Sequence, residues 1–165
     1  MELRKSIKIS MFLAITIVLS IIESMIPIFN GSIPGIKLGL ANIIIVTILY
    51  LYSFKDALFV TTMKVILVGI LRTGIFSTTF FLSLTGSILS VFAMGFVKKT
   101  KLSIVGTSVI GSIFHTIGQL IMAMLILKNI NLIYYFPYIT LSALITGIII
   151  GLLSKQLLLF LNENF

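Results

Sequence analysis

The chain has 165 residues, of which 59% are hydrophobic and 10% are charged, and its mean hydropathy is +1.25. Because roughly a quarter of the residues in soluble proteins are charged, this composition excludes a water-soluble globular protein and predicts one that lies in lipid. The net charge of +8 does not indicate nucleic-acid binding, since the basic residues stand in small groups between apolar runs.

Six apolar runs follow one another along the chain, and each is predicted to be a transmembrane helix. In chain order they cover residues 9–28, 38–52, 57–71, 80–97, 104–127 and 132–153. The first run follows three basic residues, as in a signal peptide, but it is too long for one and has no cleavage site, so we expect it to be retained. The sequence therefore predicts an all-α, polytopic membrane protein with a single transmembrane domain over residues 1–165.

The second and third runs, 38–52 and 57–71, are short for membrane spans. A helix of 15 residues rises only about 22 Å, whereas the hydrocarbon core is about 30 Å thick. We expect these two helices to start within the headgroup region or to border a thinned or water-lined cavity. Short, glycine-rich spans are also typical of binding sites in transporters.

The basic residues predict the orientation of the helices. With the N-terminus inside and six crossings, one side carries eight Lys and Arg residues and the other carries three. The eight are Arg4, Lys5, Lys8, Lys55, Lys98, Lys99, Lys101 and Lys155, and the three are Lys37, Arg72 and Lys128. Both termini are therefore predicted to be cytoplasmic, in a protein of the bacterial cell membrane.

Two charged residues, Glu23 and Lys64, lie inside the apolar runs. A charge near the bilayer centre costs roughly 2.5 to 3.5 kcal/mol, so each is expected to face protein or water. Counted from the loops that follow them, both lie about 10 to 12 Å from the outer face. They are interpreted either as an ion pair that locks the first helix to the third or as part of the lining of a pocket.

Other polar residues fall at mid-membrane or further out. His115 and Gln119 are one turn apart on the fifth run, on a face that also carries Gly111 and so leaves a gap for a ligand or another helix. Each is either an interhelical hydrogen-bonding residue or part of a pocket. Asn42 lies near the start of the second run, just after a loop with Pro, Gly and Lys37 that would suit a cap over a cavity or serve as a plain connector.

Metal and cofactor chemistry is not expected. There is no cysteine, one histidine and four acidic residues in total, so we predict neither a metal site nor a cofactor. The predicted substrate-binding residues are Glu23, Lys37, Asn42, Lys64, His115 and Gln119.

Small residues repeat every four positions on two runs, a spacing that lets membrane helices approach closely. Ala143, Gly147 and Gly151 form one such stripe, and Ser10 and Ala14 form the other. Stripes of this kind are usually internal packing and only weakly indicate a partner surface.

With these residues in place, the chain resembles the family called heptaprenyl diphosphate synthase component I or Gx transporter. The resemblance covers nearly the whole length and rests on three segments: the Glu-Ser-Met-Ile-Pro run of 23–27, the Ile-Pro-Gly-Ile-Lys-Leu-Gly-Leu-Ala-Asn run of 33–42, and the His-x-x-Gly-Gln segment of 115–119. That family in turn resembles the substrate-binding S components of energy-coupling factor (ECF) transporters, which implies a six-helix bundle whose first helix docks on a coupling subunit. Ser10 and Ala14 would match that docking stripe loosely.

The sequence itself tests one implication of this resemblance. Prenyltransferases bind diphosphate through magnesium held by two aspartate-rich clusters, and this chain has one aspartate, Asp56. It also lacks the Gly-x-x-x-x-Gly-Lys-Ser/Thr motif for ATP. We therefore predict that it is not an enzyme and that any prenyl transfer or ATP hydrolysis belongs to another chain.

Three hypotheses for function follow. The first is a membrane-embedded, S-component-like subunit that binds a small molecule of unknown identity and is energised by an ECF-type coupling subunit and ATPases. The second is a non-catalytic accessory membrane subunit for prenyl-quinone synthesis or extracytoplasmic electron transfer. The third is a free-standing carrier coupled to protons or sodium through Glu23. Membrane lipid is the one partner that all three share.

Overall fold

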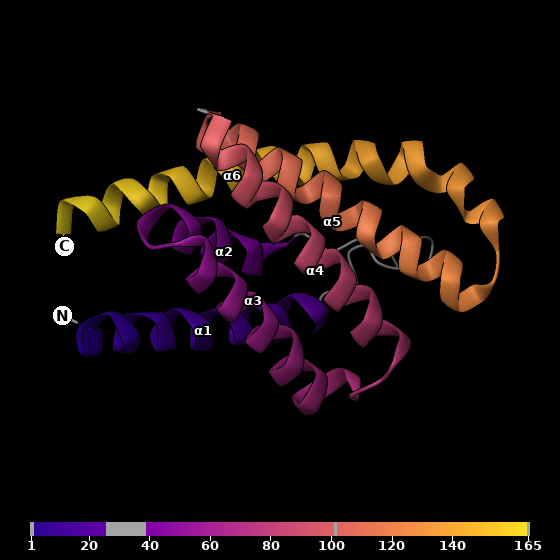
Figure 1. The fold of residues 1–165 in the computed structure, drawn as a ribbon, viewed down its shortest axis with the longest axis horizontal. Helices are drawn as coiled ribbons and strands as arrows, with labels where there is room; N and C mark the ends of the chain where they lie inside the picture. Colours follow the sequence, from indigo (N-terminus) through magenta and orange to yellow (C-terminus); the bar gives the residue numbers. More distant parts are fainter. Residues whose placement is uncertain (1, 26–38, 101, 165) are drawn as a thin grey trace.

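The computed structural model describes residues 2–25, 39–100 and 102–164, and these fold into a helical bundle (Figure 1). Its helices are α1 (Glu2–Met25), α2 (Leu40–Leu51), α3 (Phe54–Val68), α4 (Thr78–Val97), α5 (Ile104–Leu127) and α6 (Phe136–Asn164). A π-helical segment, Gly69–Thr73, continues α3, and 3-10 segments Lys98–Thr100 and Ile130–Tyr135 flank α5. No strand occurs in these ranges, so the all-α prediction is confirmed.

Successive helices run in alternating directions, and the start of α1 lies at the same end of the bundle as the end of α6 (Figure 1). We call this the termini end; the connections from α2 to α3 and from α4 to α5 also lie there, whereas those after α3 and α5 lie at the opposite end. This is the alternation that the sequence predicts for six helices. The assignment of the termini end to the cytoplasm stays a prediction.

Four helical stretches in the described ranges are long and apolar enough to cross a membrane: Leu3–Glu23, Thr78–Thr100, Ile104–Leu127 and Ile130–Leu161. The predicted short second run is confirmed, because α2 has 12 residues and rises only about 18 Å. The fifth run, predicted as 104–127, coincides with α5.

The third run is longer than predicted, because α3 begins at Phe54 and its helical backbone continues through Thr73. The hydroxyl oxygen of Ser53 accepts a hydrogen bond from the backbone N–H of Asp56 and caps the start of the helix. At the other end Gly74 has a φ of +83°, a backbone conformation that residues with a side chain rarely adopt, and the helix ends there. Arg72, predicted to lie in a loop, is therefore helical.

The sixth run was predicted wrongly at both ends. Its first residues form the 3-10 segment Ile130–Tyr135, and α6 then continues to Asn164, well past the predicted end at 153. The polar residues at 154–156 suggested a helix end, but they contain neither Gly nor Pro and are followed by further apolar residues, so nothing in the backbone stops the helix.

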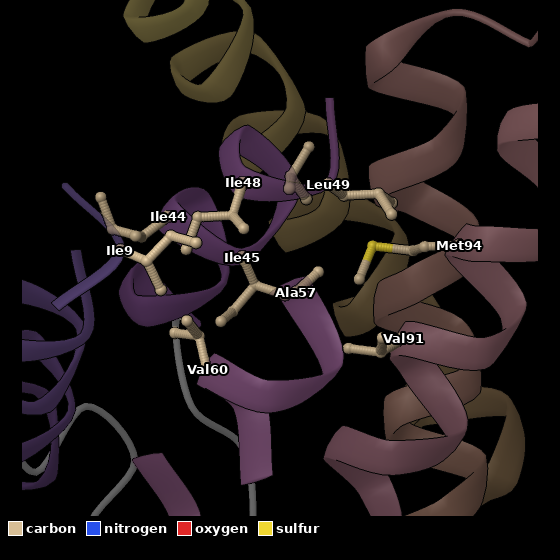
Figure 2. Close-up of a cluster of buried hydrophobic side chains, with 10 residues drawn as sticks. Ile9, Ile44, Ile45, Ile48, Leu49, Ala57, Val60, Val91 and Met94 are labelled. Atoms are coloured by element: carbon tan, nitrogen blue, oxygen red, sulfur yellow. The ribbon is translucent and has the colours of Figure 1, made fainter. Parts of the chain in front are cut away.

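The short helix α2 lies at the centre of the first half of the molecule. Its residues from Ile44 to Leu49 are all buried, so that more than one full turn has no exposed face. Figure 2 shows the isoleucines of α2 meeting Ile9 of α1, Val60 of α3 and Met94 of α4 in one cluster. Because protein surrounds α2, it has no need to match the thickness of the lipid.

The second half packs through small residues instead. A Cβ added at Gly118 of α5 would lie 2.9 Å from the Cα of Gly86 on α4, so the two backbones nearly touch. On the other face of α5, the hydroxyl of Ser108 donates to the carbonyl of Gly147 on α6 at 2.9 Å. A Cβ at Gly151 would lie 2.7 Å from the Cα of Val105. The stripe of 143, 147 and 151 is therefore internal packing between α5 and α6.

Candidate functional site

The end of α1 meets the start of α2 at Gly39. The backbone N–H of Gly39 donates a hydrogen bond to Oε1 of Glu23, a side chain that is 6% exposed. Gly39 has a φ of +78°, and a Cβ there would lie 2.8 Å from Cδ1 of Ile150 on α6. Gly39 is the N-cap residue of α2 and has no side chain that could cap the helix. The Glu23 carboxylate instead supplies a hydrogen-bond acceptor at this helix start. Glu23 thus links α1 to α2.

Asn42 lies beside the same junction. Its backbone N–H donates to the carbonyl of Gly39 at 2.7 Å, and its Nδ2 would lie 3.3 Å from a Cβ at Gly39. The structure therefore brings Glu23 and Asn42, two of the predicted site residues, to one point. Lys37 and the rest of the predicted capping loop lie outside the described residues.

Lys64 lies on the buried face of α3 and is 8% exposed. Thr61, three residues earlier and 1% exposed, shares that face. The Oγ1 of Thr61 has no hydrogen-bond partner among the described residues. Thr62 next to it, like Thr47 on α2, instead donates to the carbonyl four residues back, at 2.9 and 2.8 Å. The hydroxyl of Thr61 is therefore a buried polar group with unused hydrogen-bonding capacity.

Two contacts tie α3 to α1. At the termini end Nζ of Lys5 lies 2.8 Å from Oδ2 of Asp56, and at the other end Nη1 of Arg72 donates to the carbonyl of Ile21 at 3.2 Å. The two helices consequently run in the same direction side by side. Their register follows from these contacts, since both join residues 51 positions apart.

The register of α1 against α3 bears on the predicted ion pair between Glu23 and Lys64. Along its own helix axis, Glu23 lies about 3 Å beyond Ile21, whereas Lys64 lies about 12 Å before Arg72. A direct ion pair would require the long Lys64 side chain to extend along α3 toward the end of α1. The pairing stays a prediction.

The pKa of Asp56 is lower than the usual aspartate value. Burial raises this pKa, but hydrogen bonds from the side chains of Lys5 and Ser53, together with the positive charge of Lys5, favour the carboxylate and outweigh burial. The hydroxyl of Ser53 donates to Oδ2 of Asp56 at 2.6 Å. This cluster fastens the start of α3 to α1 and is structural.

His115 and Gln119 form a second group, at the interface between α5 and α4. A Cβ at Gly86 of α4 would lie 2.8 Å from Cγ of Gln119 and 3.2 Å from Cε1 of His115. The gap predicted beside Gly111 is filled by Met94, whose sulfur would lie 2.5 Å from a Cβ at that glycine. At these positions α4 occupies the face, as the helix alternative predicts. A contribution of either polar side chain to ligand binding stays a prediction.

Ser10 and Ala14, the predicted docking residues, are both exposed on α1. Their neighbours Met11 and Val18 are exposed as well, so this side of α1 is uncovered in the chain by itself. The face is thus accessible to lipid or to a partner helix.

Thr61 is the site candidate that the sequence did not identify. Threonine is common in membrane helices and usually donates to its own backbone, so no pattern distinguishes Thr61 from Thr62. Only the position of Thr61 three residues before the charged Lys64 hinted at it. In the part of the chain that the structure describes, no three His, Asp or Glu residues are grouped as metal ligands would be.

The chain matches a known family. The model of the family described as heptaprenyl diphosphate synthase component I matches residues 12–157. Neither the comparison with curated proteins nor that with solved structures gives a match. The matched range includes most of α1, which carries Glu23, and continues through most of α6.

Proposed function

This chain belongs to the heptaprenyl diphosphate synthase component I family, and we propose that it is a membrane-embedded subunit that binds a small molecule and works with partner chains. One observation carries this proposal: Glu23 and Lys64 are 6% and 8% exposed in helices that are otherwise largely apolar. Each charge costs roughly 2.5 to 3.5 kcal/mol in the membrane. A purely structural contact between helices is achieved at less cost by apolar side chains.

The groups near Lys64 suggest the chemistry of the ligand. An ammonium group only donates hydrogen bonds, and the unused hydroxyl of Thr61 can donate or accept. Together they suit a ligand with oxygen acceptors, such as a carboxylate, a phosphate or a ring carbonyl. Such a molecule would lie among apolar walls with a few polar anchors, which is the usual form of a small-molecule site.

Movement of the ligand would need other proteins. This chain has no ATP-binding motif, so the proposal assigns energy coupling to partner ATPases and a membrane coupling subunit of the ECF type. The exposed side of α1 with Ser10 and Ala14 is available for contact with such a subunit. Orientation with both termini in the cytoplasm, and hence a ligand site toward the outside, belongs to the same proposal.

Native mass spectrometry of the protein purified from its own membranes tests ligand binding. We expect the wild-type chain to retain a small molecule and Lys64→Met to retain less by a factor of about ten or more, because a hydrogen bond to a charged group contributes about 1.5 to 3 kcal/mol. Thr61→Val removes only the hydroxyl and should reduce retention by a smaller factor.

Thr62→Val is the matched control, because the hydroxyl of Thr62 is bonded to the carbonyl of Leu58. It should leave retention unchanged. The proposal is wrong if the wild-type protein retains nothing, or if folded Lys64→Met and Thr61→Val variants retain as much as the wild type.

The family name favours a second function, a non-catalytic membrane component of heptaprenyl diphosphate synthase. The single aspartate of this chain leaves the magnesium-dependent chemistry to a partner, as that role requires. Affinity purification from native membranes separates the two functions. A soluble prenyltransferase with aspartate-rich motifs supports the synthase role, whereas ATPases with a membrane coupling subunit support transport.

A further inference from the structure

A cavity of about 320 Å³ lies at the termini end, between α2, α5 and α6. Its lining residues are Tyr50, Leu51, Ile104, Lys155, Leu158 and Leu159. This space is partly open to the surroundings, so it is a surface pocket and not an enclosed packing void. Its volume falls at the lower limit of ligand pockets, which span about 300 to 1,000 Å³. The cavity therefore has room for part of a molecule.

One wall of the cavity is held in place by polar contacts. The hydroxyls of Tyr50 and Thr107 share a hydrogen bond of 2.8 Å, which joins α2 to α5. Lys98 donates to the carbonyl of Leu49 at 2.5 Å, and its Nζ lies 5.2 Å from the centre of the Tyr50 ring. Lys98 thus neutralises the carbonyl end of α2 and fixes the aromatic wall. The wall is preorganised.

Lys155 differs from Lys98 in its contacts. It is exposed, and within the ranges that the structure describes it makes neither an ion pair nor a hydrogen bond. Four of the other lining residues are aliphatic. A free cation at an apolar cavity is complementary to an amphiphile, in which an anionic group adjoins a hydrocarbon chain.

We propose that this cavity binds an anionic phospholipid from the leaflet at the termini end, with its phosphate at Lys155 and the upper part of one chain against Ile104, Leu158 and Leu159. The location supports this occupant, because Lys155 lies in the last third of α6, toward the termini end, where we expect the headgroups of that leaflet. The basic segment Lys98–Thr100 at the same end adds to the attraction for negative headgroups. The lipid would fill the space between α2 and the last turns of α6. This site does not depend on the ligand proposed near Lys64.

Native mass spectrometry from vesicles containing equal amounts of phosphatidylglycerol and phosphatidylcholine tests the proposal. The wild-type chain should retain phosphatidylglycerol preferentially. Lys155→Ala should lower this preference about fivefold, the effect of one lysine near a membrane surface. Lys155→Arg should restore it. Leu159→Trp keeps the charge but fills the cavity from a half-exposed position, and it should reduce retention of both lipids.

Lys99→Ala is the matched control, since Lys99 is also exposed at the termini end but does not line the cavity. It should lower the preference clearly less than Lys155→Ala does, because Lys99 contributes only to the general attraction of this end for negative headgroups. Equal loss in Lys99→Ala and Lys155→Ala would overturn the proposal, because the attraction would then belong to the surface as a whole. Equal retention of the two lipids by the wild type, or displacement of the lipid by millimolar inorganic phosphate alone, would also overturn it.

Discussion

The helices α1–α3 and the helices α4–α6 are packed by different kinds of side chain. In the first set, large apolar residues surround α2, and polar contacts join the helix ends, such as Lys5 with Asp56 and Glu23 with Gly39. In the second set, glycines and serines let the backbones approach so closely that an added Cβ at Gly118 would meet backbone atoms at 2.9 Å. Large buried side chains stabilise the first set, and close approach of the helix backbones stabilises the second.

This difference shows which helices have space for buried polar side chains. Close backbone contact leaves no space, so His115 and Gln119, although polar, lie against α4. The first set uses long side chains, and among them it buries Glu23, Lys64 and Thr61. We therefore expect substitutions that affect the ligand proposed near Lys64 to lie mainly in α1–α3, and substitutions that act by steric overlap to lie mainly in α4–α6.

The largest effect is expected from Gly118→Leu. The atoms facing Gly118 are backbone atoms of Thr85 and Gly86, which cannot move aside, so the substitution should force α4 and α5 apart. We expect a loss of stability of about 3 kcal/mol or more, measured by circular dichroism during thermal unfolding in detergent. Gly106→Leu is the control, because the nearest atoms at Gly106 belong to the side chains of Leu102 and Ser103. Equal losses of stability in both variants would contradict the conclusion that close backbone approach stabilises α4–α6.

Ile48→Ala tests the other half. Ile48 is fully buried in the cluster around α2, so the substitution leaves a cavity in the middle of α1–α3. We expect a loss of about 2 kcal/mol, toward the lower end for such truncations. Ile145→Ala on the exposed side of α6 should cost much less in the same unfolding assay. A larger loss for Ile145→Ala would show that lipid contact, not α2, governs packing here.

Glu23→Gln should have a smaller effect on stability and a specific effect on α2. Glutamine keeps an acceptor for the N–H of Gly39 but removes the charge, so we expect a loss of about 1 kcal/mol. Hydrogen exchange at the first turn of α2 should increase, whereas exchange in α5 should not. Unchanged exchange in α2 would mean that Glu23 does not hold this helix start.

The smallest effect is expected from Asp56→Asn, which breaks an ion pair at the edge of the bundle for about 0.5 kcal/mol. Because the folded-state pKa of Asp56 is lowered, its contribution to stability is present above the ordinary aspartate pKa of about 4 and is lost as the pH falls through the folded value. Wild type and variant should therefore differ in stability above about pH 4 and converge only once the pH has fallen below the lowered pKa of Asp56. A difference that persists at low pH would contradict this assignment.

Much of the fold could be predicted from the sequence, because membrane insertion constrains each run of residues locally. Apolar length and the positions of the basic residues predict helices in alternating directions, and α5 begins and ends where its run does. The helix ends were predicted less well, since Ser53 as a cap and the 3-10 segment before α6 depend on single hydrogen bonds. The buried positions of Glu23 and Lys64 were predicted from the cost of a charge in lipid.

The sequence by itself determined that this chain is a helical membrane protein with two charges inside its apolar helices, because composition and burial cost apply to each residue wherever its neighbours lie. Only the tertiary structure decided that α2 is central, that His115 and Gln119 meet α4, and that the hydroxyl of Thr61 has an unused hydrogen bond. These features depend on which helix faces meet. That choice is made by contacts between residues far apart in the chain, and the spacing along a single helix does not encode it.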